Sequence, residues 1–204
     1  MATLLQLPVI HAEPVERADA ARNRDRILCA ARRLFAERGP ACVSMEEIAA
    51  AAGVGKGTLF RRFGSRAALV RELLSDKEAA LQEAIIRGEP PLGPGAPPRE
   101  RLIAFGEAVL GLLDSHADLL IAAEGGGARF GAAPYAVYRL HMTLLLREAD
   151  LRCDAEFLAE TLLACLGADF FIYLRERREM PLERVLAGWR ELVCQLAAPC
   201  TPAG

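Results

Sequence analysis

Four side chains that can bind phosphate lie close together in the segment from Lys56 to Arg62, which reads K-G-T-L-F-R-R. Lys56, Arg61 and Arg62 are cations, and the Thr58 hydroxyl can donate a hydrogen bond. Cations and hydroxyls grouped in this way contact the phosphate oxygens of nucleic-acid backbones. The chemistry that this segment predicts is therefore binding of a polyanion.

The residues before this segment carry the signals that start and end a helix. Ser44 can cap a first turn, and Glu47, three residues later, can reach back to the Ser44 amide as a capping box. Ala49 to Ala52 favour helix, and Gly53 can end it in the left-handed conformation. The sequence predicts a short helix followed by a tight turn.

A second helix over residues 56–63 would follow this turn. Leu59 and Phe63 share one face of it, which leaves the cationic side chains on the rest of its circumference. A helix fits the major groove of DNA, and its first N–H groups attract a phosphate. The two helices therefore predict a helix-turn-helix that binds double-stranded DNA, and a surface helical hairpin that is basic by chance is the alternative.

The run from Arg22 to about Leu74 resembles the DNA-binding domain of the TetR family of bacterial transcriptional repressors. It covers about a quarter of the chain. The residues that carry the resemblance are Ile27, Ala30, Leu34, Phe35, Gly39, Val43, Ile48, Ala49, Ala52, Gly53, Val54, Gly57, Thr58, Leu59, Phe60, Phe63 and Leu69.

This resemblance implies roles for individual side chains. In the family, residues matching Thr58 and Phe60 touch operator phosphates, and the residue matching Arg66 binds a phosphate from the next helix. Phe60 lacks the hydroxyl of the usual Tyr, Gly55 replaces the usual Ser cap, and Arg66 replaces Lys. The full set of expected DNA contacts is Ser44, Lys56, Gly57, Thr58, Phe60, Arg61, Arg62 and Arg66.

The distribution of charge agrees with DNA binding at one end of the chain. The formal net charge is only −2. Between Arg22 and Ser75, however, eleven Lys or Arg residues stand against five acidic residues, a net charge of +6, so the rest of the chain carries −8. A basic head on an acidic body suits nucleic acid at the head alone.

Composition and pattern predict an all-α chain. Hydrophobic residues make up 52% of the 204, aromatic residues only 6%, and no sustained alternating pattern marks a strand. We expect a three-helix helix-turn-helix head and a helical body that binds an effector and forms the dimer. The expected bounds are a flexible tail over 1–20, the head over 21–66, the body over 67–198 and a second tail over 199–204.

Two long helices are expected at the end of the body, over 154–178 and 181–196, and both are apolar on more than one face. In TetR-like proteins the last two helices pair with their copies, which implies a homodimer that reads a palindromic operator. The alternative is that these helices form the core of a monomer. The other helices of the body are expected over 65–87, 99–115, 117–123 and 135–149.

The resemblance also implies a mostly apolar cavity for a small-molecule effector in the body. Asp169 stands out in it because Leu162, Leu166 and Tyr173 share its predicted helix face, where an ionised carboxylate is costly unless it is paired. Its partner could be a cationic or hydrogen-bonding ligand, Arg129, Arg139 or an Arg of a second copy. For the histidines, a satisfied or exposed imidazole is the alternative to ligand contact. The expected lining is Phe105, His116, Tyr138, His141, Met142, Asp169, Phe170 and Tyr173.

Other classes of protein are disfavoured. The sequence has no G-x-S-x-G, H-E-x-x-H, Walker or zinc-ligand spacing, so we expect no enzyme activity, metal or cofactor. The six cysteines lack paired spacing and indicate reduced thiols in a cytoplasmic protein, with redox sensing through Cys200 as the alternative. No apolar run reaches about 18 residues, so no membrane segment is expected. The remaining rival is a helical interaction module whose basic head binds polyanions or an acidic protein.

Overall fold

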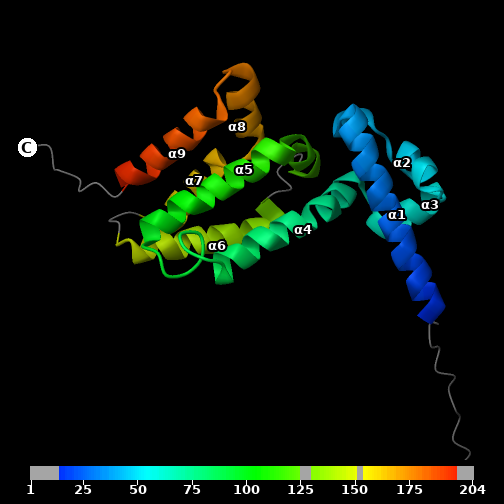
Figure 1. Cartoon of the computed structure of the whole chain (residues 1–204), viewed down its shortest axis with the longest axis horizontal. Coiled ribbons are helices and arrows are strands. Elements are labelled where there is room, and N and C mark those ends of the chain that lie inside the picture. Colours follow the sequence, from blue (N-terminus) through cyan, green and yellow to red (C-terminus); the bar gives the residue numbers. More distant parts are fainter. Residues whose placement is uncertain (1–13, 125–129, 151–153, 197–204) are drawn as a thin grey trace, which may run out of the picture. The chain divides into compact units, whose positions relative to one another are not determined.

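The computed structural model describes residues 14–124, 130–150 and 154–196, and within these ranges every regular element is a helix (Figure 1). The chain divides into two compact units, Met1–Ser65 and Arg66–Gly204. Each unit has its own packed helices, and each is described by itself below.

The first unit packs three helices around a small apolar core. Its buried side chains recur along the first helix at helical spacing and meet those of the second, while Leu59 is the buried residue of the third. The elements are α1 (Pro14–Arg38), the short 3-10 turn η1 (Pro40–Cys42), α2 (Met45–Ala52) and α3 (Lys56–Phe63).

The second unit is built around α5, which packs against α4, α6, α8 and α9. In Figure 1, α4 and α6 lie along one side of α5 and α9 lies along the other. Phe105, Met142 and Leu162 are among its fully buried side chains. The elements are α4 (Arg66–Arg87), α5 (Pro98–Glu124), α6 (Ala133–Glu148), α7 (Ala155–Cys165), α8 (Ala168–Ile172), the π-helical turn η3 (Tyr173–Arg177) and α9 (Leu182–Leu196).

Two of these elements are interrupted. A single non-helical residue, His116 (φ −145°), kinks α5 between the two helices expected there. The single helix expected over 154–178 is wrong, because α7 ends at Cys165 and α8 begins only after Gly167, whose backbone is extended (φ −77°, ψ 144°). This break changes which side chains of the segment share a face.

Within the described ranges no single helix is long and apolar enough to cross a bilayer. One bent pair, Ala155–Cys165 with Ala168–Arg177, passes by length and composition alone.

Candidate nucleic-acid interface and ligand cavity

The start of α2 is a complete capping box. The Ser44 amide donates to the Glu47 carboxylate at 2.8 Å, and the Glu47 amide donates to the Ser44 hydroxyl oxygen at 3.2 Å. The same hydroxyl donates back to the Glu47 carboxylate at 2.8 Å. Ser44, one of the expected DNA contacts, therefore has a hydroxyl that already holds the helix start.

Arg38, at the end of α1, reinforces this cap. Its guanidinium donates to the Glu47 carboxylate at 2.6 Å and to the Cys42 carbonyl oxygen at 2.8 Å. The hydrogen bond from the Ser44 amide, followed by that from Arg38, lowers the pKa of Glu47 to about 2. The capping carboxylate is thus ionised at any ordinary pH.

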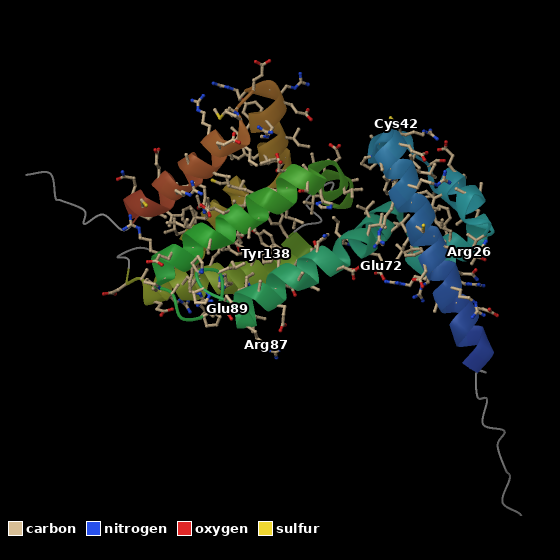
Figure 2. All side chains as sticks on the ribbon, viewed as in Figure 1. Arg26, Cys42, Glu72, Arg87, Glu89 and Tyr138 are labelled. Atoms are coloured by element: carbon tan, nitrogen blue, oxygen red, sulfur yellow. The ribbon has the colours of Figure 1, made fainter. Side chains whose placement is uncertain are left out.

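The turn between α2 and α3 depends on Gly53. Its φ of 64° lies in the left-handed region, and its N–H reaches the Ala49 and Ala50 carbonyl oxygens. The Gly53 carbonyl oxygen accepts a hydrogen bond from Arg26 of α1 at 3.3 Å (Figure 2 labels Arg26). A Cβ at residue 53 would lie 2.6 Å from that guanidinium, which is the movable end of a long side chain, so the positive φ is the main reason for glycine here.

The third helix begins without a side-chain cap. Gly55 supplies only its carbonyl oxygen, which accepts from the Thr58 and Leu59 amides at 2.9 and 3.2 Å. Nothing lies within 4 Å of the place where a Cβ of Gly57 would stand, so the backbone of the first turn is open to a close approach. An uncapped, open helix start of this kind favours an anion.

The expected DNA contacts on α3 are exposed, with the exception of the half-buried Thr58. Lys56 forms an ion pair with Glu46, and its amine lies 5.7 Å from the centre of the Phe60 ring. The Phe60 side chain is 38% exposed. Arg66 is half-buried at the start of α4, in the second unit. The exposed members are Lys56, Gly57, Phe60, Arg61 and Arg62.

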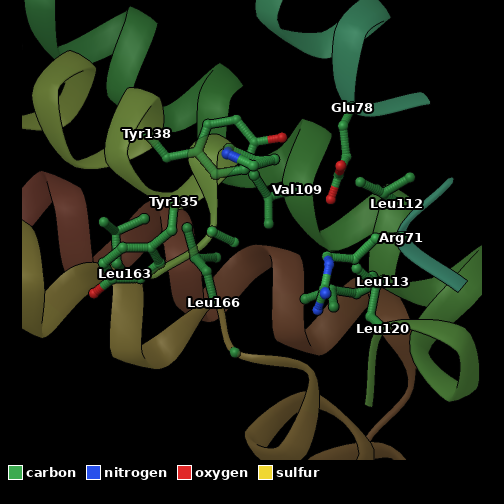
Figure 3. Close-up of a pocket in the computed structure, with 13 residues that line it drawn as sticks. Arg71, Glu78, Val109, Leu112, Leu113, Leu120, Tyr135, Tyr138, Leu163 and Leu166 are labelled. Atoms are coloured by element: carbon green, nitrogen blue, oxygen red, sulfur yellow. The ribbon is translucent and has the colours of Figure 1, made fainter. Parts of the chain in front are cut away.

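The second unit contains a cavity of about 80 Å³ between α4, α5, α6 and α7 (Figure 3). Most of its wall is aliphatic. Figure 3 shows the Tyr138 hydroxyl and the Glu78 carboxylate directed toward the same side of the cavity, with Arg71 beside Leu113 and Leu120. The lining residues are Arg71, Glu78, Val109, Leu112, Leu113, Leu120, Ala132, Pro134, Tyr135, Tyr138, Leu163, Leu166 and Gly167.

Two polar groups of this wall are poorly solvated. Burial raises the pKa of Glu78, and the positive charge of Arg71 only partly opposes that shift. Burial, and then the negative charge of Glu78, raise the pKa of the Tyr138 hydroxyl. Among the described residues this buried hydroxyl has no hydrogen-bond partner.

The Tyr138 ring packs in a cluster of ring side chains. The ring of the fully buried Phe105 lies 5.4 Å from the Tyr138 ring and 5.4 Å from the His141 ring, centre to centre. Burial, with a smaller contribution from the charge of Arg101, lowers the pKa of His141 to about 4, so its imidazole is neutral at pH 7. Met142 is fully buried beside it on α6. Of these expected ligand residues, only Tyr138 lines the cavity.

The other expected ligand residues lie elsewhere in the second unit. His116 lines a separate hollow of about 270 Å³ with Lys77 and Leu81. Phe170 lines a groove of about 440 Å³ along α5, α8 and α9. The exposed ring of Tyr173 stacks on the Phe170 ring at 6.4 Å, centre to centre.

The expectation of a desolvated Asp169 in an apolar stripe is wrong, since its side chain is exposed. The helix break at Leu166 and Gly167 is the reason, because it removes Asp169 from the face that Leu162 and Leu166 share. Two of the partners considered for it, Arg129 and an Arg of a second copy, lie outside the described residues, as does Cys200.

Of the lining residues, only Tyr138 was expected from the sequence, and the unexpected ones include two charged side chains of α4, Arg71 and Glu78. A signal for Glu78 was present. Leu74, Leu81 and Ile85 are buried at helical spacing, and Glu78 stands in the same row, so a carboxylate interrupts an otherwise apolar stripe. Within the described ranges no group of three or more His, Cys, Asp or Glu could hold a metal ion.

One family of known proteins matches part of the chain, from α1 into α4. The profile described as bacterial regulatory proteins, tetR family, matches residues 27–73. An uncharacterised HTH-type transcriptional regulator of Mycobacterium tuberculosis is 60% identical over 45 residues, which are 22% of this chain and 22% of that protein. The matched segment thus spans about a fifth of the length of that curated relative.

Solved structures match over most of both chains. FadR of Thermus thermophilus, a TetR-family repressor solved with lauroyl-CoA, has a TM-score of 0.66 at 23% identity, covering 89% of this chain and 98% of that one. A proposed transcriptional regulator from Pseudomonas aeruginosa PAO1 has a TM-score of 0.60 at 26% identity, covering 93% and 94%. These findings confirm the expected all-α fold, with a helix-turn-helix head and a helical body, and the TetR resemblance.

Proposed function

Because this chain belongs to the TetR family of bacterial regulatory proteins, we propose that it is a ligand-responsive transcriptional repressor that binds a palindromic operator as a homodimer. The observation that carries the proposal is the surface of α3. Lys56, Arg61 and Arg62 are exposed there beside an uncapped and open helix start. This surface offers cations to DNA phosphates and a helix narrow enough to enter the major groove.

The proposed DNA contacts are those expected from the sequence, but Ser44 has a different role. Lys56, Gly57, Thr58, Phe60, Arg61 and Arg62 come from α3, and Arg66 comes from the start of α4. Ser44 contributes through its cap, because its hydroxyl is already hydrogen-bonded twice to Glu47. Phe60 has no hydroxyl for phosphate and instead presents an exposed ring.

A homodimer is proposed through the last helices. Phe170, Tyr173 and Leu192 leave large apolar surfaces exposed on α8, η3 and α9, beside the groove of about 440 Å³. Exposed apolar patches of this kind commonly mark an interface. A two-fold axis would present two helix-turn-helix heads to half-sites about one DNA turn apart, roughly 34 Å, or a multiple of it.

The cavity of the second unit is the proposed effector site. A mostly aliphatic wall with few polar groups is the usual composition of a ligand pocket. Its volume of about 80 Å³ favours a molecule far smaller than lauroyl-CoA, the ligand of the Thermus protein. A regulator of this kind acts on chromosomal DNA, and the cytoplasm of a bacterium is its proposed location.

The rival function is a helical module whose basic head binds polyanions or an acidic protein without reading sequence. Selection of bound duplexes from a random library, at about physiological salt, separates the two. We expect enrichment of one palindrome by the full-length chain and its loss with Arg61→Ala or Thr58→Ala. Salt-sensitive binding with no enriched sequence would support the rival and overturn the proposal.

A further inference from the structure

One side of the cavity wall between α4, α5, α6 and α7 carries two oxygen-bearing groups that the fold leaves incompletely satisfied. The Tyr138 hydroxyl is buried without a hydrogen-bond partner among the described residues. The half-buried Glu78 carboxylate is directed toward it in Figure 3. A buried hydroxyl without a partner and a desolvated carboxylate both cost free energy that a bound donor would recover.

The rest of the cavity is suited to a short hydrocarbon. Val109, Leu113, Leu163 and Leu166 line it and offer no hydrogen bonds from their side chains. Its volume of about 80 Å³ is below the roughly 150 Å³ of an apolar cavity that holds benzene. A linear chain of a few carbon atoms is therefore the largest body that this space accepts.

The cation that also lines the cavity does not replace such a donor. The Arg71 side chain is exposed, so solvent screens its charge, whereas Glu78 is half-buried. Burial raises the pKa of Glu78 more than the positive charge of Arg71 lowers it.

We propose that this cavity binds a short aliphatic primary amine as its ammonium ion, with the charged nitrogen between the Glu78 carboxylate and the Tyr138 hydroxyl. The inference rests on the proposed role of the body as an effector-binding domain. An ammonium ion has three N–H donors, so it can reach both oxygens at once. Its hydrogen bond to Glu78 is charge-assisted, which an alcohol of the same length cannot match.

Three probes of equal chain length test the ligand class on the full-length chain without DNA. Binding of n-butylamine, 1-butanol and butyrate is measured near pH 7 by thermal-shift titration, with ionic strength matched by sodium chloride. We expect butylamine to bind at least tenfold more tightly than butanol, and butyrate to give no shift. Equal binding of amine and alcohol, no shift with any probe, or a preference for butyrate through Arg71, would overturn the inference.

Variants then assign the contact to these residues. Glu78→Gln should weaken butylamine binding at least tenfold while leaving butanol binding unchanged, and Tyr138→Phe should weaken it several-fold. Glu83→Gln is the matched control, because Glu83 lies on the same helix, is exposed and pairs with Arg87. Full retention of butylamine binding by Glu78→Gln would contradict the proposed site. If a variant fails to fold, the comparison of the three probes on the wild-type chain still tests the inference.

The outcome is independent of the operator experiment. A palindrome selected by the chain, together with no amine binding, would overturn this inference and leave the proposed repressor intact. Amine binding with no selected palindrome would support the amine site and overturn the proposed repressor. If both hold, butylamine should also weaken operator binding by the wild-type chain and not by Glu78→Gln.

Discussion

The indole ring of Trp189 in α9 occupies the space that a side chain at Gly106 in α5 would need. The indole N–H donates to the Ile103 carbonyl oxygen of α5 at 3.1 Å, and Trp189 is only 5% exposed. A Cβ at residue 106 would overlap the ring. The missing side chain therefore lets α9 pack closely against α5, next to the groove proposed as the dimer interface.

Replacing this glycine should loosen α9. We expect Gly106→Ala to lower the free energy of unfolding by about 1–3 kcal/mol, the usual cost of overpacking a core. Urea denaturation followed by circular dichroism measures it. Gly111→Ala is the control, since nothing lies within 4 Å of its added Cβ in the same helix, and Ala there should stabilise by about 0.5–1 kcal/mol. Equal effects of the two substitutions would contradict the packing described for Trp189.

The cap of α2 should give stability a defined pH dependence. The pKa of Glu47 is about 2 in the folded chain and 4.5 without its partners, so the ionised carboxylate stabilises the fold fully above pH 4.5. That contribution is lost as the pH falls from 4.5 toward 2. Urea unfolding should therefore show Glu47→Gln to be less stable than wild type at pH 7, with a difference that shrinks over this window.

A control for this cap is Glu37→Gln, which removes an exposed carboxylate near the end of α1 outside the capping box. It should change stability little at any pH. A Glu47→Gln deficit that persists unchanged at pH 2 would show that the carboxylate charge is not what holds the helix start.

Two glycines of the helix-turn-helix should separate folding from DNA binding. Gly53→Ala should cost about 1–2 kcal/mol of stability, because an alanine is forced into the left-handed region at φ 64°. Gly57→Ala should leave the fold at least as stable, since the position is helical and open, but should weaken DNA binding through a methyl group on the exposed face. Denaturation curves and gel shifts measure the two effects. Loss of stability in Gly57→Ala alone would refute this division.

Glu46 should moderate the affinity of α3 for DNA. Its ion pair with Lys56 neutralises part of the positive charge on this surface, and the same contact lowers the pKa of Glu46. Glu46→Gln should therefore tighten DNA binding and steepen its dependence on salt, whereas Lys56→Ala should weaken binding and reduce the salt slope by about one. Affinity titrations over a range of salt concentrations test this. An unchanged slope in both variants would place Lys56 away from the phosphates.

The helix-turn-helix could be predicted because its signals are local. Ser44 and Glu47 stand at capping-box spacing, Gly53 stands where a left-handed residue must, and Leu59 repeats with Phe63 at helical spacing. These features define the helices without knowledge of the rest of the chain. The capping bonds of the structure are those that the spacing predicts.

The cavity was harder to predict because it depends on how helices meet. The break at Leu166 and Gly167 has no proline to announce it, and it turned the expected Asp169 site into exposed surface. The role of Glu78 depends in the same way on how α4 packs against the other helices, although its carboxylate interrupts the row of Leu74 and Leu81. The close packing of Trp189 against Gly106 joins residues 83 positions apart, and no local pattern reveals such a contact.

Whether α3 reads DNA sequence can be measured as the ratio of two dissociation constants. The full-length chain is titrated at about physiological salt with the palindrome selected from the library and with a scrambled duplex of the same composition. We expect the palindrome to bind at least about 10³-fold more tightly, the lower end of the range for specific regulators. A ratio near one would contradict this expectation and leave α3 as a general polyanion surface.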